Sequence, residues 1–225
     1  MNSLREIAQA ILTVPAYRIL AGLFVSSSLA VAIVDRRLVV LPFMLQYILA
    51  TILVGPQLYG PLVPIRLGIG ASVGLMLLLS AERIERAAHP AEIDRGETSG
   101  GTMMGRARQS SDMGLLFRLL CAVMAGLVAL SLARSWPLVI APFAVTLGSY
   151  WLLCLGMITL LTAGNAYRLA IGLLSSVLGF ETILLLLERS LLVVALMGIA
   201  HLLIALAAAV LAEREHHLPI EDKPL

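Results

Sequence analysis

Apolar stretches recur along the chain, and short polar, glycine- or proline-containing segments separate most of them. Each stretch holds about 20 residues, which is long enough for a helix to cross a hydrocarbon core of about 30 Å. We place the predicted spans at 16–34, 38–55, 61–81, 114–133, 139–162, 167–187 and 191–212. The predicted fold class is therefore all-α, a polytopic transmembrane helical bundle of about seven spans.

Composition agrees with this prediction. Hydrophobic residues make up 60% of the chain and charged residues 13%, and the mean hydropathy is +0.96. An ordinary soluble domain is roughly half apolar and a quarter charged, so we expect an integral membrane protein in contact with the lipid bilayer. The formal net charge of +2 is too small to indicate a nucleic-acid partner.

The link between the third and fourth spans is the longest. Residues 82–112 are rich in charge, glycine and serine and have no apolar periodicity, which predicts a polar loop. This loop divides a three-helix membrane part, 1–81, from a four-helix membrane part, 113–212, and residues 213–225 form a polar tail.

Basic residues are distributed unequally between the two sides of the predicted bundle. One side holds Arg5, Arg18, Arg134 and Arg189, and the other holds Arg36, Arg37, Arg83, Arg86, Arg95, Arg106, Arg108, Arg168, Arg214 and Lys223. Because basic residues favour the cytoplasmic side, we predict an external amino terminus and a cytoplasmic carboxyl terminus, loop and tail.

Several membrane chemistries lack the residues they need. Lys223, in the tail, is the only lysine, so no span can form a Schiff base with retinal. His201 is the only histidine within a span, whereas a bis-histidine haem needs two. Cys121 and Cys154 lie in different spans without the spacing of a metal site. We therefore expect no cofactor and no metal.

Three ionisable residues fall well inside the predicted spans: Arg66, Glu181 and His201. Such residues cost about 2.5 kcal/mol or more at a bilayer centre and usually serve a function. At a rise of about 1.5 Å per residue, their depths below the outer surface are roughly 7, 9 and 15 Å. They form one polar string if their helices are neighbours. The alternatives are a proton path, an Arg66–Glu181 ion pair that fixes helix register, and an Arg66 that faces lipid and reaches the surface.

Small residues gather in the third span, at Gly68, Gly70, Ser72 and Gly74. They make one side of this helix thin, which predicts close packing of a neighbouring helix against it.

The region from 150 to 212 is similar to a known family. The sequence YWLLCLGMITLLTAGNAYRLAIGLLSSVLGFE at 150–181 resembles the helix, asparagine-containing turn and Gly-Leu-Leu helix of the family containing subunit K of NADH-quinone oxidoreductase and component E of membrane-bound nickel-iron hydrogenases. LQYILATIL at 45–53 resembles that family's Leu-Gln second helix, and Arg66 stands about where component E often has a lysine. The main likeness covers three of the predicted helices, and chain length and helix count resemble component E.

The chain departs from this family at the acidic position. The family usually carries an acidic residue a few positions after the Gly-Leu-Leu start, where this chain has Val177, Leu178 and Gly179. Glu181 lies one turn further on nearly the same face, and His201 is adjacent to where component E tends to carry an aspartate. The resemblance therefore implies either a proton path rerouted through Glu181 and His201 and tuned by Arg66, or a relative that no longer pumps and serves as a scaffold.

The resemblance also implies a place for the chain. It would be a non-catalytic membrane subunit of a hydrogenase-like or complex-I-like ion-translocating oxidoreductase complex, without a redox centre of its own, in a prokaryotic plasma membrane. Its partners would be other membrane subunits, including antiporter-like ones. A stand-alone carrier or channel for a small solute is the alternative.

The predicted orientation can be tested at Ser99, in the middle of the polar loop. A cysteine placed there should be shielded from a membrane-impermeant thiol reagent in intact cells and should react once the cells are broken open. Labelling in intact cells would reverse the predicted orientation.

Overall fold

Seven α-helices account for most of the part of the chain that the computed structural model describes, residues 15–33, 38–58, 62–93, 103–138, 140–188 and 190–217. The helices are α2 (Ala16–Ala32), α3 (Val40–Val54), α4 (Leu62–Ile93), α5 (Met103–Ser135), α6 (Phe143–Leu161), α7 (Ala166–Leu187) and α8 (Leu191–His217), with a short 3-10 helix, η1 (Gly55–Gln57), after α3. The predicted all-α fold is confirmed.

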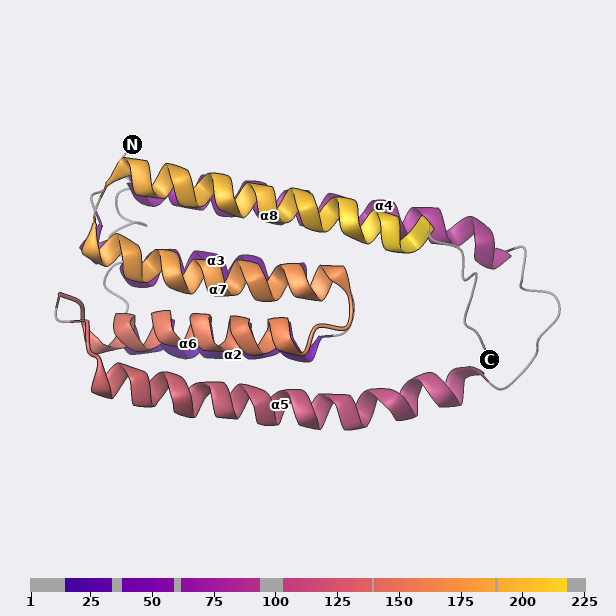
Figure 1. Cartoon of the computed structure of the whole chain (residues 1–225), viewed down its shortest axis with the longest axis horizontal. Coiled ribbons are helices and arrows are strands. Elements are labelled where there is room, and N and C mark those ends of the chain that lie inside the picture. The colour runs from indigo at the N-terminus through magenta and orange to yellow at the C-terminus, as the bar shows by residue number, and fades with distance from the viewer. Residues whose placement is uncertain are drawn as a thin grey trace.

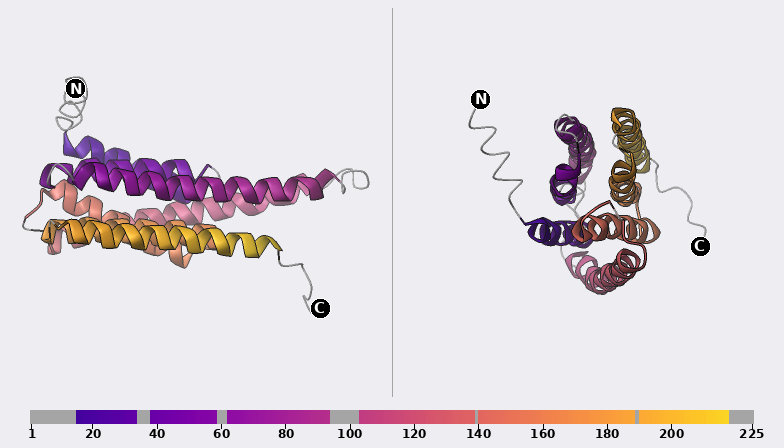
Figure 2. Two further views of the ribbon diagram at one scale, coloured as in Figure 1. Left: turned by 90° about the horizontal axis from the view of Figure 1, so that it is seen from above. Right: turned by 90° about the vertical axis from the view of Figure 1, so that its left-hand side faces the viewer.

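The helices stack as pairs (Figures 1 and 2). Helices α4 and α8 lie side by side, followed by α3 with α7 and then α2 with α6, while α5 packs against α6 and α2 at the end of the stack. Helices α2, α3 and α4 form one column, in which α3 contacts α2 and α4. Helices α6, α7 and α8 form the other, in which α7 contacts α6 and α8. Helices α3, α4, α8 and α7 therefore form a four-membered ring in which α4 lies diagonally opposite α7, and α3 diagonally opposite α8.

Six of these helices are long and apolar enough to cross a membrane, and α2, with 17 residues, is a shorter apolar helix. Their outward faces are strongly apolar, as on α5, where the exposed side chains are Leu116, Phe117, Leu119, Leu120, Val123, Met124, Leu127 and Val128. Such a surface suits a lipid environment. Exposed Tyr17 and Trp136 lie at one end of the bundle, where aromatic residues commonly mark the membrane–water interface. The chain is a helical integral membrane protein.

The predicted polar loop is shorter than expected. Residues 82–93 continue α4, and residues 103–112 belong to the beginning of α5, so the prediction of a loop was wrong for both segments. Figure 1 shows these helices extending past the ends of α3 and α7. The prediction relied on missing apolar periodicity, and a helix whose sequence is polar on all sides lacks this periodicity too. Residues 94–102 and the tail beyond His217 lie outside the described residues, as do Arg36 and Arg37.

Helices α6 and α7 make the closest contact in the bundle, through glycine residues. A Cβ atom added to Gly172 would lie 2.8 Å from the Leu160 nitrogen and 3.0 Å from the Gly156 oxygen, and one at Gly179 would lie 2.6 Å from the Leu153 nitrogen. The two backbones therefore touch directly, as in other small-residue interfaces of membrane helices.

The small residues of α4 divide between two faces. A Cβ atom on Gly70 would overlap the Tyr47 ring, and one on Gly74 would lie 2.6 Å from Met44 Cγ, so both glycines admit α3 as predicted. Nothing lies within 4 Å of a Cβ atom on Gly68, and Ser72 is exposed. The prediction of close packing is confirmed for Gly70 and Gly74 and wrong for the other two.

The glycine contact predicts a specific loss of stability. Gly172→Ala forces two helix backbones apart, so it should lower the free energy of unfolding by about 1 to 3 kcal/mol. Thermal unfolding of the purified chain in detergent measures the effect. Gly68→Ala is the matched control, because its methyl group enters open space; equal midpoints for the two variants would contradict the role of Gly172.

Candidate functional site

Arg66, Glu181 and His201 meet inside the ring formed by α3, α4, α7 and α8. Arg66 lies on α4, Glu181 on α7 and His201 on α8, and their relative exposures are 0, 1 and 0%. The sequence predicted one polar string on the condition that the three helices are neighbours, and the structure meets this condition. Their positions along the helices agree with the similar depths estimated for Arg66 and Glu181.

Arg66 and Glu181 form an ion pair across one diagonal of this ring. The Arg66 Nε atom lies 3.3 Å from Glu181 Oε1, and Nη2 donates a hydrogen bond to Oε2 at 3.5 Å. Nη2 also donates to Thr182 Oγ1 at 3.0 Å, and that hydroxyl donates to the Leu178 carbonyl oxygen at 2.8 Å. Thr182 thus completes the acceptor surface that faces the guanidinium group.

This geometry decides between two interpretations of Arg66, a lipid-facing arginine and an ion-pair partner of Glu181. A lipid-facing arginine would expose its side chain along the helix surface, but Arg66 is completely buried, so that interpretation was wrong. The ion-pair interpretation is confirmed as geometry. An ion pair does not exclude proton exchange by the same carboxylate.

His201 approaches the second oxygen of the same carboxylate. Its Nδ1 atom is 2.8 Å from the Met197 carbonyl oxygen, which can only accept, so Nδ1 carries a hydrogen. In neutral imidazole Nε2 is then an acceptor, and it lies 3.9 Å from Glu181 Oε2, beyond direct hydrogen-bond distance. Two acceptors face each other there, so one additional proton on either group would turn the contact into an attraction.

Tyr47 of α3 completes the cluster, although the sequence analysis did not single it out. Its ring centroid lies 5.7 Å from that of His201 and 5.9 Å from Arg66 Cζ, and its side chain is 1% exposed. The available signal was depth: Tyr47 is seven residues from the carboxyl-terminal end of α3, the predicted outer end, which is about 10 Å and close to the values for Arg66 and Glu181. Thr182 could have been noticed as the polar neighbour of Glu181.

Several polar atoms in this region are buried without a hydrogen-bond partner among the described residues. They are the Tyr47 hydroxyl, Arg66 Nη1 and His201 Nε2; Arg66 Nε also lacks hydrogen-bond geometry, although it lies 3.3 Å from Glu181 Oε1. An unsatisfied buried polar group costs about 1 to 3 kcal/mol. A cluster with several such groups is not optimised for stability alone, which is a common property of functional sites.

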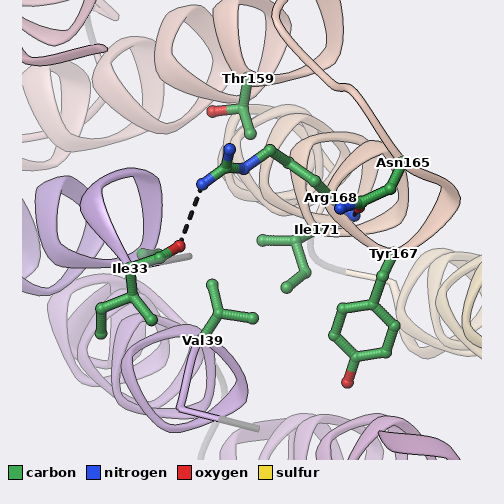
Figure 3. Close-up of a pocket in the computed structure, with 8 residues that line it drawn as sticks. Ile33, Val39, Thr159, Asn165, Tyr167, Arg168 and Ile171 are labelled. Atoms are coloured by element: carbon green, nitrogen blue, oxygen red, sulfur yellow. Dashed lines mark hydrogen bonds between the residues drawn. The ribbon is translucent and has the colours of Figure 1, made fainter. Parts of the chain in front are cut away.

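Arg168 forms a second polar contact near the opposite end of the bundle (Figure 3). Asn165 caps α7 by accepting a hydrogen bond from the Arg168 backbone nitrogen at 2.8 Å. The Arg168 Nη2 atom donates to the carbonyl oxygens of Val31 and Ile33 at 3.2 and 3.0 Å. It therefore gives hydrogen-bond donors to carbonyl groups at the carboxyl-terminal end of α2, which have no partner within the helix. The adjacent cavity, lined in part by Thr159, has a volume of about 20 Å³, enough for one water molecule. We interpret Arg168 as a structural clamp.

Comparisons with protein-family models, curated proteins and solved structures find no match to this chain. The resemblance to subunit K and component E therefore stays a prediction based on the residues that carry it.

The ion pair predicts how the chain responds to loss of one charge. Glu181→Gln leaves the buried Arg66 guanidinium without its counter-ion, which typically costs about 3 to 5 kcal/mol of stability. Adding Arg66→Gln should recover most of this loss, because it removes the unpaired charge. Thermal unfolding of both purified variants measures the recovery; a double variant less stable than Glu181→Gln would contradict the pairing.

Proposed function

We propose that this protein is a membrane subunit of an ion-translocating assembly, of the hydrogenase-like or complex-I-like kind, and that Glu181 and His201 belong to a proton path. In this proposal Arg66 holds the Glu181 carboxylate in place and supplies the positive charge that balances it. The chain itself performs no redox chemistry, and its apolar outer faces pack against partner membrane subunits as well as lipid.

One observation carries this proposal: Glu181 is shared between a permanent cation and a titratable imidazole, deep in a membrane-spanning bundle. Ionisable residues at such depth are expensive and commonly mark ion pathways. Arginine keeps its proton, so Arg66 can only supply charge. Glu181 and His201 can each take or release one, and the 3.9 Å between Oε2 and Nε2 leaves a position for that proton, directly after a small movement or through one water.

A membrane scaffold is the second candidate. It is favoured by the contacts of Arg66, which joins α4 to two successive residues of α7, Glu181 and Thr182. A tie of this kind fixes the register of two helices that lie diagonally in the ring. The scaffold and the proton path predict the same stability effects and differ in transport.

The proposal can be tested in the native assembly. A tagged chain purified from its own membranes should carry other membrane subunits with it. The interior of vesicles that contain the complex should acidify when the complex turns over. The Arg66→Gln, Glu181→Gln double variant should assemble but pump poorly, because the carboxyl group is gone. His201→Asn should also assemble and lose most pumping. A pH-sensitive dye in the vesicles measures transport, and subunit recovery measures assembly.

Two outcomes would contradict the proton path. Normal pumping by the assembled double variant would leave the pair as a structural tie in a scaffold. A purified chain that transports a small solute without any partner would instead support a stand-alone carrier.

A further inference from the structure

The ring of Tyr47 lies against both basic groups that meet Glu181. Arg66 Cζ is 5.9 Å above the ring centroid, and the His201 ring is 5.7 Å away at an interplanar angle of 80°. An aromatic ring attracts cations within about 6 Å of its centroid, and the attraction is strongest where water is absent. Tyr47 is therefore placed to interact with Arg66, and a protonated His201 imidazole would lie at a similar distance from the same ring.

The hydroxyl group of Tyr47 is buried close to the Arg66 guanidinium, but it forms no hydrogen bond of good geometry with any described residue. The ring of Tyr47 makes the contact with the Arg66 guanidinium and the edge contact with the His201 ring. A phenylalanine would preserve them, whereas an aliphatic residue would not.

The surroundings of the ring leave it room on one side and constrain it on another. Gly70 lies one helical turn after Arg66 on α4, and a methyl group there would overlap the ring. Near the same ring lies an apolar cavity of about 210 Å³, lined by Met44, Ile48, Leu67 and Ala71 as well as Tyr47 and Gly70. The ring therefore borders open space on this side.

We propose that Tyr47 is a positioning residue whose ring couples Arg66 to His201. Through this ring, protonation at the Glu181–His201 contact changes the strength of the Arg66–Glu181 ion pair. A proton on Nε2 creates a second cation next to Arg66, and the shared ring offsets part of their repulsion. This inference rests on the proposed function, because it assumes that Glu181 and His201 exchange a proton, and it adds the residue that connects the exchange to the ion pair.

The test follows the protonation of Glu181 in the full-length chain reconstituted in lipid nanodiscs. Infrared spectra record the carbonyl stretch of the buried protonated carboxyl group as a function of pH, and Glu181→Gln identifies the band by removing it. Tyr47→Leu should shift the titration midpoint by about one pH unit, the size expected from losing a desolvated cation–ring interaction. Tyr47→Phe, which keeps the ring, should restore the wild-type midpoint.

A glycine pair provides a test that leaves Tyr47 itself intact. Gly70→Ala should displace the ring into the cavity and shift the midpoint in the same direction as Tyr47→Leu. Gly68→Ala, half a turn away on the same helix and facing open space, should leave the midpoint unchanged. Thermal unfolding confirms that each variant is folded, and Gly70→Ala serves as the main test if Tyr47→Leu does not fold.

The outcomes separate this inference from the proposed function. Equal shifts in Tyr47→Phe and Tyr47→Leu would assign the effect to the hydroxyl group and overturn the role of the ring. Unchanged midpoints in Tyr47→Leu and Gly70→Ala, with a titrating wild-type Glu181, would overturn the coupling alone. A wild-type Glu181 that never exchanges its proton would overturn the proposed proton path and this inference with it.

Discussion

The ion pair between Arg66 and Glu181 is the constraint on which the arrangement of this bundle depends. Neither charge can be hydrated at its position, so each requires the other, and α4 and α7 must stay in register to keep them together. These helices are diagonal in the ring and make few backbone contacts. The pair therefore connects α4 directly to α7, two helices that pack mainly against other neighbours. A hydrogen bond from Tyr167 to the Leu77 carbonyl oxygen, 2.8 Å long, spans the same diagonal further along.

Two modes of packing divide the bundle. Between α6 and α7, glycine residues bring the backbones into contact, which leaves no space for side chains, solvent or movement. Inside the ring of α3, α4, α7 and α8, long side chains meet instead, and several of their polar atoms have no partner among the described residues. The close-packed pair of α6 and α7 lies on one side of Glu181, and the side chains of the ring lie on the other. Functional groups are commonly found in the less completely packed part of a protein, which here is the inside of the ring.

The sequence predicted much of this structure, and its failures have physical causes. Apolar stretches of sufficient length located the helices because a spanning segment must satisfy its own backbone. The rarity of charge in these stretches identified Arg66, Glu181 and His201, and helical rise placed them at similar depths. The sequence offered the contact of Arg66 with Glu181 as one of three alternatives but could not choose among them, because helix neighbours are set by tertiary packing. Tyr47 and Thr182 were missed because an aromatic ring or a hydroxyl group is common in membrane helices. The parts of α4 and α5 at 82–93 and 103–112 were missed because their sequences show no apolar periodicity.

The unequal lengths of the helices have a consequence for the membrane around them. Helix α2 contains 17 residues, and the span formed by α3 and η1, Val40–Gln57, contains 18, which gives about 26 and 27 Å. The apolar spans of α4 and α8, Leu62–Arg83 and Leu191–Arg214, contain 22 and 24 residues and reach about 33 and 36 Å. A bilayer adapts to a short helix by thinning and to a long one by thickening or tilt. We therefore expect the hydrocarbon layer to be thinner beside α2 than beside α4 and α8, or the longer helices to tilt.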